Sequence, residues 1–306
     1  MILAFEGNGQ KGEYCYWNNQ INATAYDTSP GDHFNDDSNI LTMFKNYMAH
    51  FVNRTNTVNG QAYLTDPTIF SWELLSEGRY TTITDTNSGT TSSARLVAMT
   101  AWYSAASAYL KSIDSNHLVG TGSINQFYDY VNGDVLHNGT YYGLDYNIQH
   151  QLSTIDYFDS HWYLYDGSNN NQLFEFGQSL GFPNAISKAG ALAQWNAMVA
   201  LAKSAGKPCV IGEYGVIKSN TQNSYTASYP RAVNFNEWMG YFFADDGDGF
   251  VVWHYTNLFD DNNYNIKPDG PHSGGNANNN ANDDDTQLRQ VLRQKSAEIL
   301  GQRATV

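Results

Sequence analysis

The stretch Lys207-Pro-Cys-Val-Ile-Gly-Glu213-Tyr-Gly215 is a short apolar run that ends in a carboxylate. Pro208–Tyr214 has the length and composition of a strand that is buried on both faces. The helical pattern of Ile186–Ala205 comes directly before it and stops at Gly206. A helix that leads straight into a buried strand is typical of a parallel sheet covered by crossover helices.

The same alternation of strands and helices runs along the whole chain. The expected strands are Met1–Phe5, Thr68–Leu75, Leu118–Gly122, Ile155–Tyr163, Pro208–Tyr214 and Gly249–Tyr255. The expected helices are Asn39–Val52, Arg95–Ile113, Ile186–Ala205, Ala232–Phe243 and Thr286–Leu300. Strands separated by helical stretches predict an α/β fold.

Composition excludes several classes of protein. The 306 residues are 41% hydrophobic, which is enough to build a sizeable core. Acidic residues outnumber basic ones by 30 to 16, and the resulting net charge of −14 argues against nucleic-acid and membrane-surface binding. The sequence contains no apolar run of the roughly 18–20 residues that a membrane span needs. We therefore expect a soluble globular protein with no nucleic-acid or membrane partner.

Two cysteines, Cys15 and Cys209, exclude a disulfide framework and a cysteine-rich metal site. We expect two reduced thiols, although a single bridge stays open. The Asn-, Asp- and Gly-rich segment 268–285 is expected to be a surface loop. Glycosylation sequons occur at Asn22, Asn53 and Asn138.

Two of the expected strands end in a glutamate. One is the stretch that ends at Glu213, and the other is Thr68-Ile-Phe-Ser-Trp-Glu-Leu-Leu-Ser-Glu77-Gly-Arg79. In a parallel α/β barrel, residues at the carboxyl ends of different strands converge on one cleft. Glycoside hydrolysis needs two such carboxyl groups, one protonated to assist the leaving oxygen and one ionised to attack or to activate water.

These segments resemble motifs of glycoside hydrolase family 5, in its endo-β-1,4-mannanase branch. The Glu77 segment is similar to the family's Trp-Glu-Leu-x-Asn-Glu-Pro-Arg motif, and the Glu213 segment is similar to its nucleophile strand. Three further stretches resemble the family in the same order: Lys111–Val119, Ile155–Tyr163 and Gly249–Trp253. The resemblance implies a (β/α)8 TIM barrel without metal or organic cofactor.

Carried over position by position, the resemblance makes Glu77 the general acid/base and Glu213 the nucleophile of a retaining reaction. It implies that the two carboxyl groups lie roughly 5–5.5 Å apart. His161 and Tyr163 would line the subsite of the attacked sugar. Tyr163, or alternatively Tyr214, would donate a hydrogen bond to Glu213.

The resemblance also implies contacts around the sugar. Trp253 would form a flat floor beneath it, because the C–H faces of a pyranose pack on aromatic rings. Arg79 would pair with a carboxylate in or near the cleft. The aromatic side chains of Tyr14, Tyr16 and Trp17 would form a stacking platform at the cleft rim.

Each of these roles has a structural alternative. A glutamate at a strand end is often a solvated loop residue, His161 on an apolar strand could be a core histidine, and Trp253 could be part of the core. Trp17 could belong to ordinary loop packing. We expect Glu73 to be a structural partner of Arg79 or of a buried polar group. The remaining tryptophans of strand and helix interiors are expected in the core: Trp72, Trp102 and Trp195.

The sequence departs from the family beside the acid/base. Ser76 stands where the family has an asparagine whose amide binds the substrate 2-hydroxyl, and Gly78 stands where it has a proline. A serine hydroxyl cannot offer the two donors of an amide. Weaker or differently specific activity is therefore expected.

A (β/α)8 barrel has eight strands, and only six are counted here. The resemblance begins at the family's third strand, so we expect one catalytic domain over residues 1–306 that lacks the first two βα units. Met1–Phe5 and Gly249–Tyr255 would then be open edges. A fragment of a longer chain, strands supplied by another polypeptide, and a reduced fold all stay open.

The function that fits these observations is a retaining endo-β-1,4-glycanase, most simply a mannan endo-1,4-β-mannosidase. Its partner would be mannan, glucomannan or a related β-linked polysaccharide, which implies a secreted protein. Met1–Glu6 carries no visible secretion signal. The alternatives are a non-catalytic carbohydrate-binding protein and a structural surface protein, both derived from such an enzyme.

Overall fold

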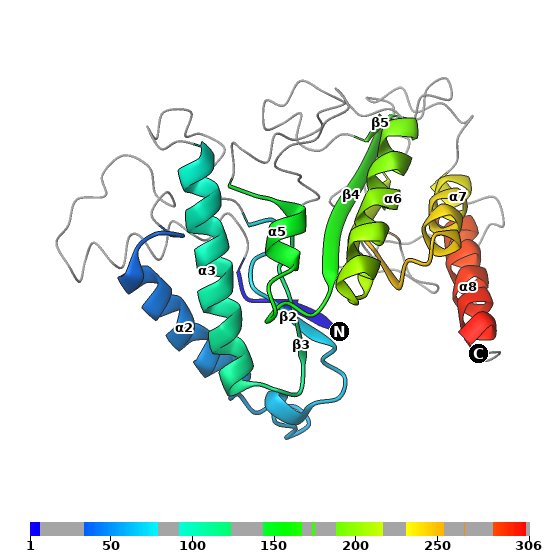
Figure 1. Cartoon of the computed structure of the whole chain (residues 1–306). Coiled ribbons are helices and arrows are strands. Elements are labelled where there is room, and N and C mark those ends of the chain that lie inside the picture. The colour runs from blue at the N-terminus through cyan, green and yellow to red at the C-terminus, as the bar shows by residue number, and fades with distance from the viewer. Residues whose placement is uncertain are drawn as a thin grey trace. The chain divides into compact units, whose positions relative to one another are not determined.

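Three short strands of the N-terminal half form a parallel sheet (Figure 1). They are β1 (Ile2–Ala4), β2 (Ser71–Glu73) and β3 (Leu118–Gly120), in the order β1-β2-β3. The connections run through α2 (Ser38–Val52) between β1 and β2, and through α3 (Ser92–Ile113) between β2 and β3. These are the crossover connections that the alternation of the sequence predicts.

The computed structural model describes residues 1–6, 34–78, 92–123, 143–166, 173–174, 188–216, 231–253, 266 and 284–303. The chain divides into two compact units. The first comprises Met1–His161, Ser179–Phe182 and Leu201–Cys209, and the second comprises Trp162–Gln178, Pro183–Ala200 and Val210–Val306.

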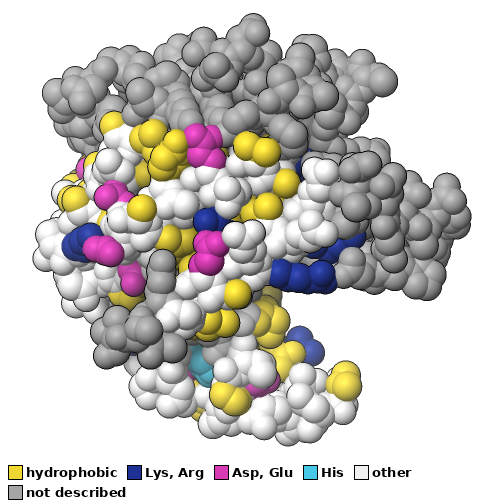
Figure 2. All heavy atoms as spheres, turned by 90° about the vertical axis from the view of Figure 1, so that its right-hand side faces the viewer, with side chains coloured by type: hydrophobic (Ala, Val, Ile, Leu, Met, Phe, Trp, Pro, Cys, Tyr) yellow, Lys and Arg dark blue, Asp and Glu magenta, His cyan; other side chains and the backbone are white. Residues whose placement is uncertain are grey.

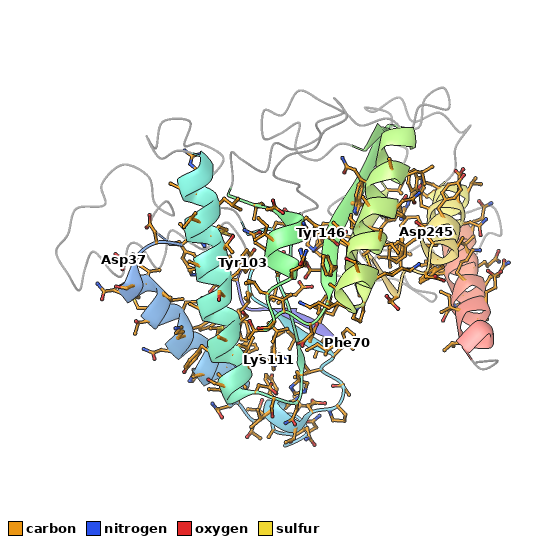
Figure 3. All side chains as sticks on the ribbon, in the orientation of Figure 1. Asp37, Phe70, Tyr103, Lys111, Tyr146 and Asp245 are labelled. Atoms are coloured by element: carbon orange, nitrogen blue, oxygen red, sulfur yellow. The ribbon has the colours of Figure 1, made fainter. Side chains whose placement is uncertain are left out.

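Aromatic side chains join the sheet of the first unit to its helices. Asp37 caps the start of α2 by accepting hydrogen bonds from the backbone N–H groups of Asn39 and Ile40 (Figure 3). The ring of Phe44 on α2 lies 5.2 Å from the Trp102 ring on α3. This buried contact holds the two helices together, and the Trp72 ring on β2, 6.0 Å from the Phe51 ring on α2, joins the sheet to α2.

A four-stranded sheet has the order β5-β4-β6-β7. Its strands are β4 (Phe158–Asp166), β5 (Leu173–Phe174), β6 (Cys209–Val216) and β7 (Gly249–Val252). β6 and β7 pair in parallel, whereas β5 pairs with β4 in the antiparallel direction. The helices are α6 (Lys188–Ala205), α7 (Arg231–Ala244) and α8 (Asp284–Arg303), and α7 packs against α8.

Trp195 on α6 lies at the centre of the core of the second unit. Its ring lies 5.0 Å from the Trp238 ring and 5.5 Å from the rings of Trp162 and Phe242. The prediction that Trp72, Trp102 and Trp195 are core residues is confirmed, since all three are buried.

The six expected strands and the five expected helices each overlap an observed element. Three further elements were not predicted: η2 (Tyr63–Thr65), α5 (Tyr146–His150) and β5. Each is too short to show a period of its own in the sequence. Among the described strands, β1 and β7 each lie at the end of a sheet, but these strands form two sheets rather than one, so β3 and β5 are end strands as well.

Several expectations concern residues at the margin of the described chain. Segment 268–283 lies outside the described residues, and α8 begins at Asp284, within the loop expected over 268–285. The sequons at Asn22 and Asn138 also lie outside, while Asn53 is exposed at the C-cap of α2. Cys209 is a buried thiol on β6, and Cys15 is not described. A single catalytic domain over residues 1–306 stays a prediction.

The described surface mixes apolar and charged side chains. Figure 2 shows small groups of apolar side chains between acidic and basic ones. Within the described part of the chain, no helix is both long enough and apolar enough to cross a membrane.

Candidate active site

Glu77 lies just beyond the carboxyl end of β2, and its backbone is held from both sides. The N–H of Ser76 donates to the carbonyl of Glu6, 2.6 Å away, and the N–H of Glu77 donates to the carbonyl of Gly122, 2.8 Å away. Glu6 follows β1 and Gly122 follows β3. The segments after three neighbouring parallel strands therefore place Glu77 at the carboxyl edge of the sheet, where α/β barrels carry their active sites.

The backbone of Glu77 adopts an unusual conformation. Its φ angle is 56°, in the left-handed region that residues with a side chain rarely occupy. This conformation costs about 1–2 kcal/mol and persists only where the surrounding structure imposes it. Such strain is concentrated at functional sites, so it supports a functional role for Glu77.

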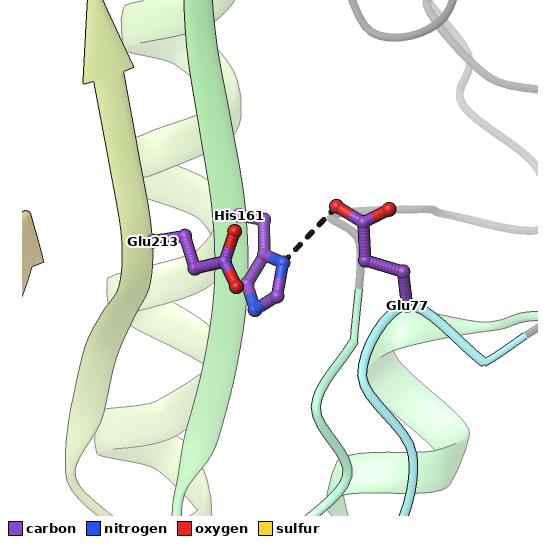
Figure 4. A group of neighbouring side chains, drawn as sticks. All are labelled: Glu77, His161 and Glu213. Carbon is purple, nitrogen blue, oxygen red and sulfur yellow. Dashed lines mark hydrogen bonds and ion pairs between the residues drawn. The ribbon is translucent and has the colours of Figure 1, made fainter. Parts of the chain in front are cut away.

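His161 on β4 orients the carboxyl group of Glu77. Its Nδ1 lies 3.2 Å from Oε1 of Glu77 (Figure 4). The imidazole is 1% exposed, whereas the Glu77 side chain is 29% exposed. A buried imidazole thus holds a carboxyl group that stays accessible from solvent, as an acid/base that must meet a substrate requires.

Glu73 has a buried polar partner rather than a surface role. The hydroxyl of Tyr157 donates to Oε1 of Glu73 at 3.2 Å and lies 2.9 Å from the hydroxyl of Ser71. Burial, together with the charges of Glu73 and Asp159, raises the pKa of Tyr157 well above its ordinary value. Tyr157 therefore keeps its proton and remains a donor to Glu73. This agrees with one of the two partners expected for Glu73, while Arg79 lies outside the described residues.

Glu213 lies in the second unit, on β6, and is partly exposed. Its neighbour Tyr214 is fully buried, as expected for successive residues that point to opposite faces of a strand. The Tyr214 ring packs 4.9 Å from the Phe235 ring, and its hydroxyl donates to Oδ1 of Asn234. A phenol has one proton to donate. The Tyr214 phenol thus directs its proton to Asn234, and the donor to Glu213 stays a prediction.

Trp253 directly follows β7. The backbone N–H of Trp253 donates to the backbone carbonyl of Tyr214 at 2.8 Å, which attaches the end of β7 to β6. The Trp253 side chain is 39% exposed, so it does not belong to the core. An exposed indole at a strand end suits the sugar-stacking role, which stays a prediction.

The structure brings Ser76, Glu77 and His161 together in the first unit, and Tyr214 and Trp253 in the second. Four expected residues lie outside the described part: Tyr14, Tyr16, Trp17 and Arg79. The backbone of Tyr163 belongs to β4, and its side chain is not described.

Sequence reasoning missed three buried polar residues beneath Glu77: His150, Tyr157 and Asp159. A signal was present, because Tyr157, which directly precedes β4, and Asp159 and His161 on β4 follow one another at every second residue, the spacing of one strand face. Glu77 and His161 offer a carboxylate oxygen and an imidazole nitrogen, two kinds of atom that can contribute to a cation site.

A family model described as GH family 5 beta-mannosidase-like matches residues 4–267. A solved endo-1,4-beta-mannanase from Rhizomucor miehei superimposes with a TM-score of 0.69 over 97% of this chain and 71% of that chain, at 23% identity. An endo-1,4-beta-D-mannanase from Thermotoga petrophila RKU-1 gives a TM-score of 0.67 over 97% of this chain and 74% of that chain, at 22% identity. These likenesses confirm the (β/α)8 barrel type of fold.

Curated relatives point to the same family. Mannan endo-1,4-beta-mannosidase 3 of Arabidopsis thaliana is 28% identical over 278 residues, which cover 83% of this chain and 58% of the relative. Mannan endo-1,4-beta-mannosidase 4 of Oryza sativa subsp. japonica is 30% identical over 163 residues, which cover 52% of this chain and 32% of the relative. The chain thus spans between a third and three fifths of the length of these relatives. The chain therefore belongs to glycoside hydrolase family 5, in its β-mannosidase-like branch.

Proposed function

We propose that the protein is a retaining endo-β-1,4-mannanase in which Glu77 is the general acid/base and Glu213 is the nucleophile. The observation that carries the proposal is the strained Glu77 at the carboxyl edge of the first sheet, with its carboxyl group held by the buried His161. The family match and the mannan-hydrolysing names of the relatives supply the substrate class.

The reaction proceeds by two displacements. In the first, the Glu77 carboxylic acid gives its proton to the glycosidic oxygen while the Glu213 carboxylate attacks the anomeric carbon, so that the glycosidic bond breaks and a glycosyl ester forms. In the second, the Glu77 carboxylate takes a proton from water, and that water attacks the same carbon and releases Glu213. The two inversions give net retention. The proposal requires the two carboxyl groups to face each other roughly 5–5.5 Å apart.

Other side chains would assist these steps. His161 orients the Glu77 carboxyl group, and Tyr163 would donate a hydrogen bond to the Glu213 carboxylate. Trp253 and Trp17 would stack on sugar rings, and Arg79 would pair with a carboxylate near the cleft. Because the substrate is a polysaccharide, we expect the protein to meet it outside the cell.

The test compares the wild type with Glu77→Gln and Glu213→Gln, and with Glu298→Gln as a matched control on the surface of α8. Release of reducing ends would be measured from β-1,4-mannan, glucomannan and cellulose. We expect the wild type and the control to cleave mannan, and both active-site variants to be inactive. Equal activity in all four proteins would contradict the assignment of both glutamates.

Ser76 supports a second candidate function, a carbohydrate-binding protein without turnover. It lies directly before Glu77, where the resemblance expects an asparagine that binds the substrate 2-hydroxyl. Loss of one such transition-state contact costs on the order of 10²–10³ in rate. Affinity for mannan oligosaccharides with no release of reducing ends would favour this alternative.

A further inference from the structure

A buried histidine–aspartate pair lies inside the first unit. His150 and Asp159 are fully buried, with Nε2 of His150 2.7 Å from Oδ1 of Asp159. Nδ1 of His150 lies 2.8 Å from the carbonyl oxygen of Tyr146, which can only accept, so Nδ1 carries a hydrogen. Asp159 thus has a hydrogen-bonding partner inside the core, which reduces the cost of burying it.

The Asp159 carboxylate binds the segment that follows β3. It accepts a hydrogen bond from the Thr121 hydroxyl at 2.6 Å, from the Gly122 N–H at 2.9 Å and from the Ser123 N–H at 3.2 Å. Burial acts to raise the pKa of Asp159, but the hydrogen bonds from His150, Thr121 and Gly122 hold it below its ordinary value. The ionised carboxylate, which accepts all of these bonds, is thus the favoured form.

The same segment also holds the chain around Glu77. The carbonyl of Thr121 accepts the N–H of Leu75 at 3.2 Å, and the carbonyl of Gly122 accepts the N–H of Glu77 at 2.8 Å. Gly122 has a φ angle of 72°, and a Cβ at this position would lie 1.8 Å from the carbonyl oxygen of Leu75. Only glycine permits this close approach.

We propose that Asp159, held by His150, is a positioning residue for Glu77. Asp159 fixes Gly122 through its N–H, and Gly122 fixes Glu77 through its carbonyl. The single residue Gly122 thus connects a buried carboxylate to the strained backbone of Glu77 through its two adjoining peptide groups. This proposal rests on the proposed acid/base function of Glu77 and explains how its unfavourable conformation is maintained.

Position along β4 supports the inference. Asp159 and His161 are separated by one residue, so their side chains leave the same face of the strand. His161 holds the Glu77 side chain directly, and Asp159 holds its backbone through Gly122. Two residues on one face of β4 therefore fix both the side chain and the backbone of Glu77.

The chain contains a matched control for this pair. Asp114 and His117 form a second buried aspartate–histidine contact, with Oδ2 of Asp114 2.7 Å from Nδ1 of His117. Asp114 also accepts the indole N–H of Trp72 at 2.7 Å. This pair precedes β3, at the opposite end of the strand from Gly122. It has similar burial and chemistry, and none of these contacts involves the segment that holds Glu77.

The kinetic test uses two substrates that differ in their need for an acid. Mannohexaose has a poor leaving group and needs a proton from Glu77, whereas 2,4-dinitrophenyl β-mannotrioside does not. For Asp159→Asn we expect kcat/KM on mannohexaose to fall by about 100-fold, as for a displaced catalytic group, with a much smaller fall on the aryl substrate. Asp114→Asn should change both values equally. The proposal would be overturned if Asp159→Asn lowered kcat/KM equally on both substrates. It would also be overturned if Asp114→Asn lowered kcat/KM much more on mannohexaose than on the aryl substrate.

A second measurement is independent of activity. Hydrogen exchange of the Leu75 and Glu77 amides, followed by NMR, should accelerate at least about tenfold in Asp159→Asn, because the carbonyls that protect them lose their support. Asp114→Asn should leave these two amides protected. If the wild type cleaves no substrate, the proposed function fails, and the exchange comparison alone decides the positioning role. Unchanged exchange at both amides in Asp159→Asn would refute it.

If Asp159→Asn does not fold, a milder variant can test the same proposal. Thr121→Val removes one hydroxyl donor to Asp159 and nearly preserves the shape of the side chain. In Thr121→Val, kcat/KM should again fall more on mannohexaose than on the aryl substrate, and the Leu75 and Glu77 amides should again exchange faster. Both effects should be smaller than in Asp159→Asn. Absence of both effects in Thr121→Val, together with an unfolded Asp159→Asn, would reduce Asp159 to a purely structural residue.

Discussion

Nδ1 of His161 lies 3.2 Å from Oε1 of Glu77, whose backbone adopts a φ angle of 56°. A nearly inaccessible imidazole therefore meets a carboxyl group that is open to solvent. The side chain is oriented by β4 while the backbone is held by the segments that follow β1 and β3. This arrangement supports the proposal that Glu77 acts as a preorganised carboxyl group.

Replacement of Glu213 by glutamine should abolish hydrolysis and preserve oligosaccharide binding. The amide has nearly the same volume but cannot attack the anomeric carbon. Steady-state rates on mannohexaose and calorimetric affinities would be measured together. A folded variant that keeps more than about 5% of the wild-type rate would remove Glu213 from the mechanism.

Replacement of Ser76 by asparagine should raise kcat. An amide beside Glu77 would supply the two-donor group that grips the substrate 2-hydroxyl, and this contact tightens in the transition state. The gain should appear in kcat rather than in KM. An unchanged or lower kcat in a folded variant would show that Ser76 serves a differently arranged subsite.

Replacement of Gly78 by alanine should destabilise the fold by about 1–3 kcal/mol, because the site has no room for a methyl group. A Cβ there would lie 2.6 Å from Cδ1 and 2.8 Å from Cβ of Leu75. Gly240 on α7 is the control, since a Cβ there would meet no atom within 4 Å. Gly240→Ala should stabilise the helix by up to about 1 kcal/mol. Thermal unfolding would compare the two, and equal stability changes would contradict the packing described around Gly78.

Acid should weaken the fold through its buried aspartates. Burial alone would raise the pKa of Asp114, but hydrogen bonds from His117 and Trp72 hold it below the ordinary value. A carboxyl group whose pKa is lowered on folding stabilises the protein above its unfolded pKa of about 3.9, and this contribution is lost as the pH falls through the folded value. The difference in unfolding free energy between the wild type and Asp114→Asn should therefore be constant above about pH 5 and narrow as the pH falls below the unfolded pKa of about 3.9. A difference that stays constant or widens below this pKa would contradict the assignment.

The strands and helices were predictable because their periodicity is local. Pro208–Tyr214 is a short run that is apolar up to Glu213, and Asn39–Val52 repeats its apolar residues at helical spacing; both patterns are confirmed by β6 and α2. The short α5 and β5 were not predictable, since two to five residues cannot show a period.

The candidate site was predictable only in part. Strand-end glutamates and ordered motifs pointed to Glu77 and Glu213, but the His161–Glu77 hydrogen bond joins residues far apart in the sequence. Likewise, no local pattern reveals that Gly122 connects Asp159 to Glu77.

We propose above that the protein hydrolyses β-1,4-mannan with retention through Glu77 and Glu213. The most direct measurement follows the cleavage of mannohexaose by proton NMR and records which anomer of the new reducing end appears first. We predict that the β-anomer appears first with the wild type and that neither anomer appears with Glu213→Gln. First appearance of the α-anomer, or equal cleavage by both proteins, would contradict the account.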